Sequence, residues 1–438
     1  MERIAVLGAG ESGVGTALLA MKNGYEVFVS DYGEIPGKYK EELKINNIPF
    51  EEKGHSFEIL EKANLIVKSP GIPERSEVVR HFRLRGKKII SEIEWASRFF
   101  GGRIIGITGS NGKTTTTSMI YHLLSEEIPG VGMGGNIGTS MARLLCGDEK
   151  FEILVLELSS FQLDDIEDIR FDIGVILNIT ADHLDRYDYN IEKYADAKWN
   201  LALSVKAAGD LVINGDDPMI TKRLSTVPAN VSVHKLSANF PMTSLPSKDG
   251  DLLFEMNLKG RHNLFNANIA AKVAELMDVD NSVIIDRLKS FDAIEHRLES
   301  IGIFDGVEYI NDSKATNVES SVYALEAMNK PVIWIAGGTD KGNDYSSLVP
   351  VAGNKVKAMI CLCVDDTKLR SSFESVVDKM ATTRDMKEAI LLSRKWAEDE
   401  DVVLLSPACA SFDLFDNYEH RGREFKNVVL NIKSETRK

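Results

Sequence analysis

The chain has 438 residues and a mass of 48.5 kDa, a length typical of two to four domains rather than one small module. Hydrophobic residues make up 43% and charged residues 27%, which excludes a disordered or collagen-like chain. Lys and Arg number 52 against 66 Asp and Glu, so the formal net charge is -14. This balance lacks the basic footprint of a nucleic-acid-binding protein.

Apolar strands alternate with helical patterns in three successive cycles. The first cycle predicts strands over 3–8, 25–30, 63–69 and 87–91, and a helix over 13–23. The second predicts strands over 103–108, 151–158, 171–179 and 211–217, helices over 114–127 and 263–278, and loops with antiparallel edge strands over 237–260. The third predicts strands over 307–312, 331–338, 357–364 and 401–407, and helices over 318–329, 367–379, 385–399 and 411–432.

This rhythm predicts an α/β fold of three domains, each built on a mostly parallel sheet. Near-continuous apolar strands suit sheets that helices cover on both faces. We place the domains at 1–93, 94–297 and 298–438. The segment MERIAVLGAG has no signal-peptide pattern, and no stretch approaches the roughly 18 apolar residues of a spanning helix. We therefore expect a cytoplasmic protein without membrane insertion.

A first glycine turn, Gly8-Ala9-Gly10-Glu11-Ser12-Gly13, matches G-x-G-x-x-G between a strand and a helix. Asp31 ends the second strand 18 residues after Gly13, as in a dinucleotide-binding fingerprint. Two alternatives stay open: a tight strand-to-helix turn that merely needs glycines, which is the less favoured one, and another diphosphate held by the helix N-terminus. The motif therefore indicates a diphosphate more firmly than NAD.

A second glycine turn, Thr108-Gly109-Ser110-Asn111-Gly112-Lys113-Thr114, follows a strand and opens a helix. It matches a P-loop except that Ile107 stands where the strict pattern has glycine. The loop N–H groups suit phosphates, Lys113 suits the β and γ oxygens, and the Thr114 hydroxyl suits Mg²⁺. Two phosphate loops in separate domains argue against a dehydrogenase.

Acidic groups are expected at the ends of the following strands, where open α/β sheets hold their ligands. Glu157 ends one strand and can ligate Mg²⁺ or simply be solvated, and His183 lies beside two carboxylates after the next strand. By pattern alone Lys198 is a solvated helix residue. The four cysteines are too scattered for a disulfide framework or zinc, and Cys409 is better explained by packing than as a nucleophile.

The chain resembles the ATP-dependent muramyl (Mur) ligases of peptidoglycan synthesis. The matching segments are SPG (69–71), TGSNGKT (108–114), GGNIG (134–138), LELSSFQL (156–163), NITADHLDRY (178–187), YADAK (194–198), GRHNLFN (260–266), HRLE (296–299), NDSKATN (311–317), GGTDKG (337–342) and SPACASFDLFDNYEHRG (406–422). NDSKATN and SPACASFD resemble the members that join D-glutamate to UDP-N-acetylmuramoyl-L-alanine. Sister Mur ligases, folylpolyglutamate synthase-like ligases and a dehydrogenase are the alternatives.

The resemblance implies a Rossmann-like N-terminal domain for the UDP-sugar, a central P-loop domain for ATP and a Rossmann-like C-terminal domain for the amino acid. For ATP it implies Ser110, Asn111, Gly112, Lys113, Thr114, Thr115, Thr116, Asn263, Asn266, Arg297 and Asp312. For the UDP-substrate it implies Gly10, Ser12, Gly13, Asp31, Ser69, Gly71, Asn136 and Ser159. For D-glutamate it implies Lys314, Thr316, Lys341, Ser411, Phe412 and Tyr418.

The same resemblance implies two Mg²⁺ ions held by Thr114, Glu157, His183 and Lys198, the last as a CO₂-derived carbamate. Lys113, His183 and Lys198 are then the catalytic residues. The reaction that the resemblance implies is amide-bond formation: ATP would phosphorylate the L-alanine carboxylate, and the amine of D-glutamate would displace phosphate. The partners are these small molecules, without nucleic acid, and we expect a monomer.

Overall fold

The computed structural model of the chain describes residues 2–237, 244–247, 250–253, 261–291 and 295–435. Its contacts divide the chain into two compact units. The first unit comprises Met1–Glu255 and Phe265–Lys289, and the second comprises Met256–Leu264 and Ser290–Lys438. Among the helices of the described residues, none combines the length and apolar character that a bilayer crossing requires.

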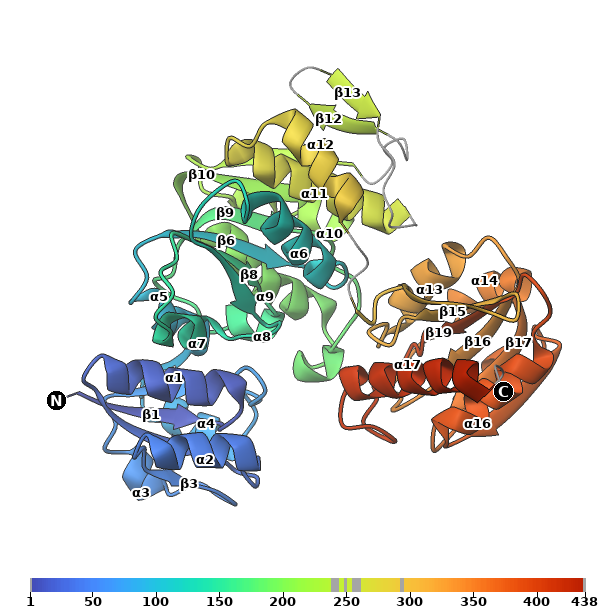
Figure 1. The fold of residues 1–438 in the computed structure, drawn as a ribbon. Coiled ribbons are helices and arrows are strands. Elements are labelled where there is room, and N and C mark those ends of the chain that lie inside the picture. The colour runs from blue at the N-terminus through green and yellow to red at the C-terminus, as the bar shows by residue number, and fades with distance from the viewer. Residues whose placement is uncertain (1, 238–243, 248–249, 254–260, 292–294, 436–438) are drawn as a thin grey trace. The chain divides into compact units, whose positions relative to one another are not determined.

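The first unit begins with a parallel five-stranded sheet in the order β3-β2-β1-β4-β5 (Figure 1). Its strands are β1 (Arg3–Leu7), β2 (Glu26–Ser30), β3 (Phe50–Glu51), β4 (Leu65–Lys68) and β5 (Ile89–Ser91). The helices around it are α1 (Glu11–Lys22), α2 (Gly37–Ile45), α3 (Phe57–Leu60), α4 (Glu77–Leu84) and α5 (Glu92–Ser97). The first glycine turn joins β1 to α1. A Cβ on Gly13 would lie 1.8 Å from the Gly8 carbonyl oxygen, so only glycine fits there.

The second sheet, also in the first unit, has six parallel strands in the order β11-β10-β9-β6-β8-β7. Its strands are β6 (Arg103–Thr108), β7 (Val131–Gly135), β8 (Ile153–Glu157), β9 (Phe171–Ile176), β10 (Val205–Asn214) and β11 (Ser232–Leu236). Its helices are α6 (Lys113–Leu124), α7 (Met141–Cys146), α8 (Ser160–Leu163), η1 (Leu184–Arg186), α9 (Ile191–Leu203), α10 (Pro218–Thr221) and η2 (Leu224–Thr226). An antiparallel pair, β12 (Ser244–Ser247) and β13 (Gly250–Leu253), precedes α11 (Arg261–Leu276) and α12 (Asn281–Ser290).

The third sheet belongs to the second unit and has the order β14-β15-β19-β16-β17-β18. Its strands are β14 (Glu299–Phe304), β15 (Val307–Asn311), β16 (Val332–Ala336), β17 (Val356–Leu362), β18 (Lys379–Thr383) and β19 (Val402–Leu405). Only β14 runs antiparallel to its neighbour. The helices are α13 (Val318–Glu326), α14 (Leu348–Lys355), α15 (Thr367–Phe373), α16 (Met386–Trp396) and α17 (Tyr418–Glu435).

Both faces of the third sheet are buried, which explains the continuous apolar strands. Val332 and Trp334 pack on the face covered by α13, α14 and α15, whereas Ile333 and Ile335 pack on the face covered by α16 and α17 (Figure 1). Successive side chains of a strand point to opposite faces, so a strand buried on both sides must be apolar at every position. The α/β class and the parallel sheets predicted from the sequence are confirmed.

Two predicted helices have clearly different bounds in the structure. The helix predicted over 411–432 begins only at Tyr418, because the Asn417 side chain accepts the backbone N–H of His420 and caps the helix there. The helix predicted over 367–379 ends at Phe373, and β18 starts at Lys379. The strand Val131–Gly135 was not predicted, because its three glycines hide the apolar pattern. Part of the predicted edge-strand segment lies outside the described residues.

The first two sheets share one hydrophobic core. Buried side chains from Ile4 in β1 through Trp95 in α5 to Phe171 in β9 form one continuous cluster. Polar contacts reinforce this packing: Arg143 of α7 pairs with Glu11 of α1 and Glu42 of α2. This joint core is why the first 255 residues form one compact unit.

Two glutamates of α5 bind backbone N–H groups of the second sheet's loops. One oxygen of Glu94 accepts the N–H groups of Glu167, Asp168 and Ile169 at 2.9, 3.0 and 3.0 Å. Glu92 accepts the N–H of Ala142 in the first turn of α7 at 2.6 Å, while its second oxygen is buried without a partner. Burial raises the pKa of Glu92 to about 7.

The raised pKa predicts how Glu92 affects stability. The folded protein binds more protons than the unfolded chain between the ordinary carboxyl pKa of 4.5 and about 7. The contribution of Glu92 therefore becomes less favourable as the pH rises through this window, by about 3 kcal/mol. Glu92→Gln removes the titration. We expect the wild type to lose stability relative to the variant as the pH rises from 4.5 to 7. Urea denaturation of both proteins across this range measures the difference in unfolding free energy. A constant difference would contradict the assignment.

Candidate functional site

The P-loop, residues 108–114, is held in place by a neighbouring strand end. The Asn178 side chain accepts the N–H of Asn111 at 2.8 Å and donates to its carbonyl oxygen at 3.1 Å. Gly112 has φ +83°, and a Cβ there would lie 2.7 Å from the Asn266 side-chain oxygen. Asn266 on α11 therefore borders the loop directly.

Two lysines donate to the same carbonyl oxygen of the P-loop. Lys113 Nζ lies 2.8 Å from the oxygens of Gly109 and Ser110, and Lys198 Nζ lies 2.8 Å from that of Gly109. Lys198 is 1% exposed. Burial, followed by the nearby positive charge of Lys113, lowers the pKa of Lys198 well below its ordinary value. The prediction of a solvated Lys198 from its local pattern is therefore wrong.

A carboxylate lies across the P-loop from these lysines. Glu157 at the end of β8 accepts the Thr114 hydroxyl at 2.7 Å and the Asn136 amide at 2.9 Å. Glu157 is buried, with 3% of its surface exposed. A buried carboxylate beside a P-loop hydroxyl offers the hard oxygen donors that Mg²⁺ prefers, so these residues fit a magnesium site.

His183 lies in a loop after β9 with left-handed backbone geometry, φ +51°. Its backbone N–H donates to Asp182, and its ring meets the Phe161 ring edge-on at 5.3 Å. Asp182 and Glu157 both counteract the fall in the Lys198 pKa, so the carboxylates face the same buried ammonium group. Lys113, Glu157 and Asp182, which come from separate segments, thus act on Lys198, and His183 follows directly after Asp182.

The first glycine turn carries the other predicted phosphate contacts. Gly10 precedes α1, and Ser12 and Gly13 lie in its first turn. Asp31 accepts the Ala9 N–H at 2.6 Å, so it also stabilises the turn itself. The Ser69 hydroxyl is buried without a hydrogen-bond partner, 2.8 Å from the position a Cβ on Gly8 would take. An unpaired buried hydroxyl beside a glycine turn fits a bound diphosphate.

Other predicted residues also have local structural roles. Ser159 caps α8 by accepting the Gln162 N–H at 3.3 Å. Thr115 and Thr116 are buried in the first turn of α6. Asn263 is buried on α11, one turn before Asn266. Gly71 accepts a guanidinium N–H of Arg186 through its carbonyl oxygen at 3.0 Å.

In the second unit, Asp312 and Arg297 lie together. Burial raises the pKa of Asp312 to about 7, while the positive charge of Arg297 acts in the opposite direction. The Asp312 carboxylate accepts the Ser406 hydroxyl at 3.0 Å. Arg297 Nε is buried without a hydrogen-bond partner. An unsatisfied guanidinium N–H beside this carboxylate fits a polar or anionic ligand.

The residues predicted to hold D-glutamate lie in the loops after β15, β16 and β19, except Tyr418, which begins α17. Lys314 Nζ sits 5.1 Å from the centre of the Tyr418 ring. Phe412 is 70% exposed and Ser411 is buried. Lys341 is exposed and Thr316 is half-buried in their loops. The carboxyl ends of parallel strands meet at one edge of the sheet, so these side chains share an edge of the second unit.

Sequence reasoning did not single out Arg421, which is 1% exposed on α17. Arg421 donates to the carbonyl oxygens of Ser313 and Cys409 at 2.9 and 3.3 Å, and so ties the NDSKATN and SPACASFD segments together. Burial lowers the Arg421 pKa to about 10. Tyr194, which is buried and whose ring lies 4.6 Å from Lys198 Nζ, was also missed. Cys409 is buried with a pKa raised to about 11 by burial, which confirms its packing role.

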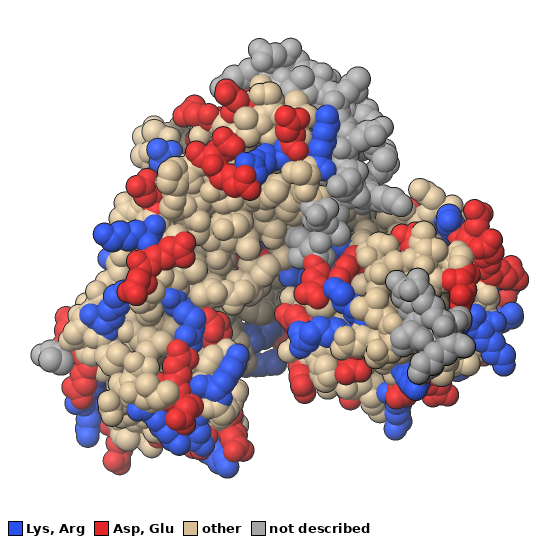
Figure 2. Space-filling view, in the orientation of Figure 1, with Lys and Arg blue, Asp and Glu red and all other residues tan. Residues whose placement is uncertain are grey.

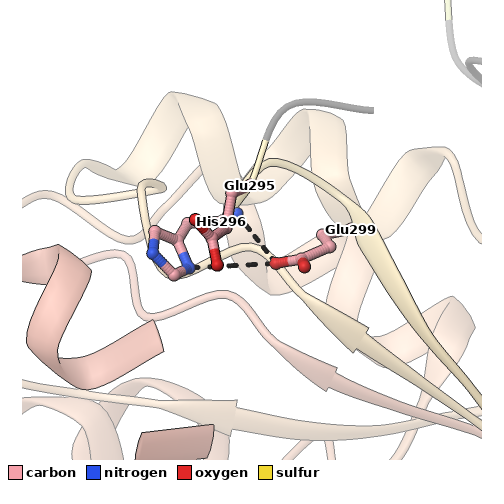
Figure 3. Close-up of side chains that lie close together, drawn as sticks. All are labelled: Glu295, His296 and Glu299. Atoms are coloured by element: carbon pink, nitrogen blue, oxygen red, sulfur yellow. Dashed lines mark hydrogen bonds and ion pairs between the residues drawn. The ribbon is translucent and has the colours of Figure 1, made fainter. Parts of the chain in front are cut away.

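Glu295, His296 and Glu299 lie close together beside Arg297 (Figure 3), with one ligand atom of each within 4.8 Å of the others. Lys426 on α17 pairs with both glutamates, at 3.4 and 2.6 Å. Asn311 donates to Glu299 at 3.0 Å and contacts His296 Nδ1 at 2.9 Å. The ammonium group of Lys426 already supplies the positive charge that a metal ion would bring to these carboxylates. We therefore interpret the cluster as a structural set of ion pairs and hydrogen bonds that connects α17 to β14 and β15.

Charge on the face shown in Figure 2 is mixed rather than segregated. Figure 2 shows acidic and basic side chains interspersed over the face in view. Lys113 of the P-loop and the buried Lys198 of α9 provide a local positive site in a chain of net charge -14. A surface of mixed charge exerts no strong long-range attraction on an anion. An anionic ligand would therefore have to be held by local cations such as these two lysines.

Three family models match the chain in consecutive segments. The MurD N-terminal domain matches residues 3–78, the Mur ligase middle domain matches 107–274, and the Mur ligase, glutamate ligase domain matches 296–409. Solved structures agree in fold. UDP-N-acetylmuramate-alanine ligase MurC from Thermotoga maritima has a TM-score of 0.63 at 17% identity, covering 99% of this chain and 100% of that one. The fold and the P-loop site thus define a Mur-type ligase.

Relatives of higher sequence identity show which kind of Mur ligase the chain resembles most. A protein named UDP-N-acetylmuramoylalanine--D-glutamate ligase from Christiangramia forsetii is 45% identical over 98% of this chain and 100% of its own length. Its namesake from Porphyromonas gingivalis is 45% identical over 98% of both chains, and that from Bacteroides thetaiotaomicron is 40% identical over 99% and 100%. The chain belongs to the UDP-N-acetylmuramoylalanine--D-glutamate ligase (MurD) family.

The unpaired Ser69 hydroxyl yields a prediction that separates binding from folding. Ser69→Ala removes a buried polar group that has no partner, so the unfolding free energy stays constant or rises by about 1 kcal/mol. The dissociation constant for UDP, measured by calorimetry, rises about fivefold to tenfold because a hydrogen bond to diphosphate is lost.

Ser97→Ala is the matched control, because the Ser97 hydroxyl donates to the Glu94 carbonyl oxygen, away from the glycine turn. We expect this control to lose stability and to keep its UDP affinity. Unchanged UDP binding by Ser69→Ala would remove Ser69 from the site.

Proposed function

We propose that the chain catalyses ATP-dependent addition of D-glutamate to UDP-N-acetylmuramoyl-L-alanine, releasing ADP and phosphate. The observation that carries this proposal is the P-loop with two lysines on one carbonyl oxygen opposite a buried carboxylate. The names of the relatives supply the substrate pair. The three-domain division at 1–93, 94–297 and 298–438 is part of this proposal, as is a cytoplasmic location.

The proposed chemistry proceeds in two steps. The L-alanine carboxylate oxygen attacks the γ-phosphorus of ATP, the bond to the β-phosphate oxygen breaks, and ADP leaves with that electron pair. The D-glutamate amine then attacks the acyl carbon, a C–N bond forms, the C–O bond breaks and phosphate leaves, while the amine loses a proton. Phosphoryl transfer relies mainly on positioning and charge stabilisation. Lys113 supplies the cation for the β and γ oxygens, replacing its present contacts with loop carbonyls.

Magnesium is the proposed metal, in two sites. The oxygens of Thr114 and Glu157 suit one ion, while Glu157, His183 and carbamylated Lys198 suit the second. Bound Mg²⁺ neutralises charge on the phosphate oxygens. The lysine carbamate forms when the amine nitrogen attacks CO₂ and loses a proton. A carbamate turns a buried cation into a carboxylate, which relieves the repulsion from Lys113 at Gly109.

Substrate contacts complete the proposal. Gly10, Ser12, Gly13, Asp31, Ser69 and Gly71 hold the UDP portion, and Asn136 and Ser159 contact the muramoyl-alanine arm. Ser110, Asn111, Gly112, Thr115, Thr116, Asn263, Asn266, Arg297 and Asp312 serve ATP. Lys314, Thr316, Lys341, Ser411, Phe412 and Tyr418 hold D-glutamate. The unpaired atoms of Ser69 and Arg297 support two of these placements, since buried polar atoms ordinarily have partners.

An amino-acid panel tests the function. Purified protein with ATP, Mg²⁺ and UDP-N-acetylmuramoyl-L-alanine should release phosphate with D-glutamate and far less with L-alanine, a diamino acid or L-glutamate. Lys113→Ala should lower turnover by about a thousandfold, because a cation on the transferred phosphoryl group is lost, with little change in thermal midpoint. Near-normal activity of Lys113→Ala would refute the P-loop assignment. Preference for another amino acid would instead indicate a sister ligase.

Lys198 gives a second test of the same site. Lys198→Ala should be nearly inactive, because the proposed carboxylate ligand is missing. Added formate or acetate should restore part of the activity by entering the vacated space. Lys193→Ala, a substitution on the exposed face of the same helix, is the control and should remain active. Full activity of Lys198→Ala, or the absence of any rescue, would contradict the carbamate proposal.

A further inference from the structure

The loop that carries His183 has unusual backbone geometry. Three of its residues, His183, Asp188 and Tyr189, have positive φ angles of 51°, 53° and 56°. Non-glycine residues in this region cost free energy and persist only when their surroundings hold them there. The position of His183 therefore depends on contacts made by the rest of this loop.

Arg186 provides those contacts from the middle of the loop. Its guanidinium group donates to the carbonyl oxygens of Gly71 at 3.0 Å and Pro70 at 3.3 Å. The same group lies 4.3 Å from the centre of the Phe161 ring, over its face. One planar cation therefore bridges the loop after β4 and the aromatic ring on α8.

Phe161 in turn touches the functional histidine. Its ring meets the His183 ring edge-on with centroids 5.3 Å apart, and stacks with Tyr187 at 6.0 Å. A second hydrogen bond starts from the loop after β4: its Arg75 donates to the carbonyl oxygen of Asp185 in the histidine loop at 3.3 Å. The histidine loop is thus tied to the loop after β4 from both sides.

The loop after β4 also borders the first glycine turn. Ser69, whose hydroxyl is unpaired, lies 2.8 Å from the position of a Cβ on Gly8 and is followed directly by Pro70 and Gly71. A ligand that bonds to Ser69 therefore acts on the same short segment whose carbonyl oxygens bind Arg186. This gives a continuous path of contacts from the glycine turn to His183.

We propose that Arg186 is a positioning residue that couples occupation of the first glycine turn by a diphosphate to the placement of His183. The UDP-sugar then does more than bind: it stabilises the histidine loop in the geometry that the reaction needs. The inference rests on the proposed function for the identity of the diphosphate. It assigns to Arg186 no contact with the reacting atoms.

The coupling can be observed without turnover. UDP is added to the protein while the ring resonances of its eight histidines are followed by NMR, with His183→Asn used to assign His183. We expect UDP to shift the His183 resonance in wild type and in Arg170→Ala. Arg170 also donates only to backbone carbonyls, at 2.9 and 2.8 Å, but lies outside this path. The shift should be lost in Arg186→Ala. A His183 resonance that never responds to UDP, or that responds equally in Arg186→Ala, overturns the proposal.

Kinetics distinguish positioning from mere structural support. Arg186→Ala should raise KM for the UDP-substrate and lower kcat, each about tenfold, while KM for D-glutamate stays unchanged. Arg186→Lys should recover only part of this loss, because an ammonium group cannot bridge two carbonyls and a ring in the same plane. A loss of thermal stability with unaltered kinetic constants would make Arg186 purely structural. An inactive wild type would instead refute the proposed function, and the UDP experiment would still decide the coupling.

Discussion

Two ammonium groups on one carbonyl oxygen, that of the buried Lys198 and that of the half-buried Lys113, are the constraint around which this site is organised. Lys113 and Lys198 each lie 2.8 Å from the oxygen of Gly109. Like charges at such proximity repel, and burial removes the water that would screen them. The arrangement becomes favourable when negative charge arrives beside it. In the proposed function, triphosphate oxygens and a carbamate on Lys198 supply that charge, so that a chain of net charge -14 can hold anionic reactants with local cations.

The surrounding fold keeps this pair in place. Asn178 fixes the P-loop backbone from the neighbouring strand, and the Ser110 hydroxyl donates to the Thr180 carbonyl oxygen at 2.8 Å. The core shared by the first two sheets extends this rigidity to the first glycine turn. Energetic coupling between two sites requires a continuous physical connection or a shared two-state element, and Arg186 provides a polar connection between these loops. In the coupling that we propose, recognition of the UDP-substrate and placement of His183 then depend on one another.

Much of the fold was predictable from the sequence because its strands are buried on both faces. Runs such as PVIWIAGG have no polar position, and the residues of β16 indeed alternate between two covered faces. The P-loop was predictable from strand, glycine turn and helix in order. The contact partner of each side chain could not be predicted from the sequence. The residues next to Lys198 in the sequence suggested that it is exposed to solvent, yet it is buried against Gly109, 89 positions away. Arg421 was missed for the same reason, since its acceptors come from segments distant in the chain.

The central claim is that the terminal phosphoryl group of ATP passes to a carboxylate oxygen before the amide forms. It is tested most directly with UDP-N-acetylmuramoyl-L-alanine whose alanine carboxylate carries ¹⁸O, in a reaction with unlabelled ATP and D-glutamate. The account predicts that the phosphate released carries one ¹⁸O atom, because the oxygen that bridges carbon and phosphorus leaves with phosphorus. Phosphate without the label, formed together with the amide product, would contradict it.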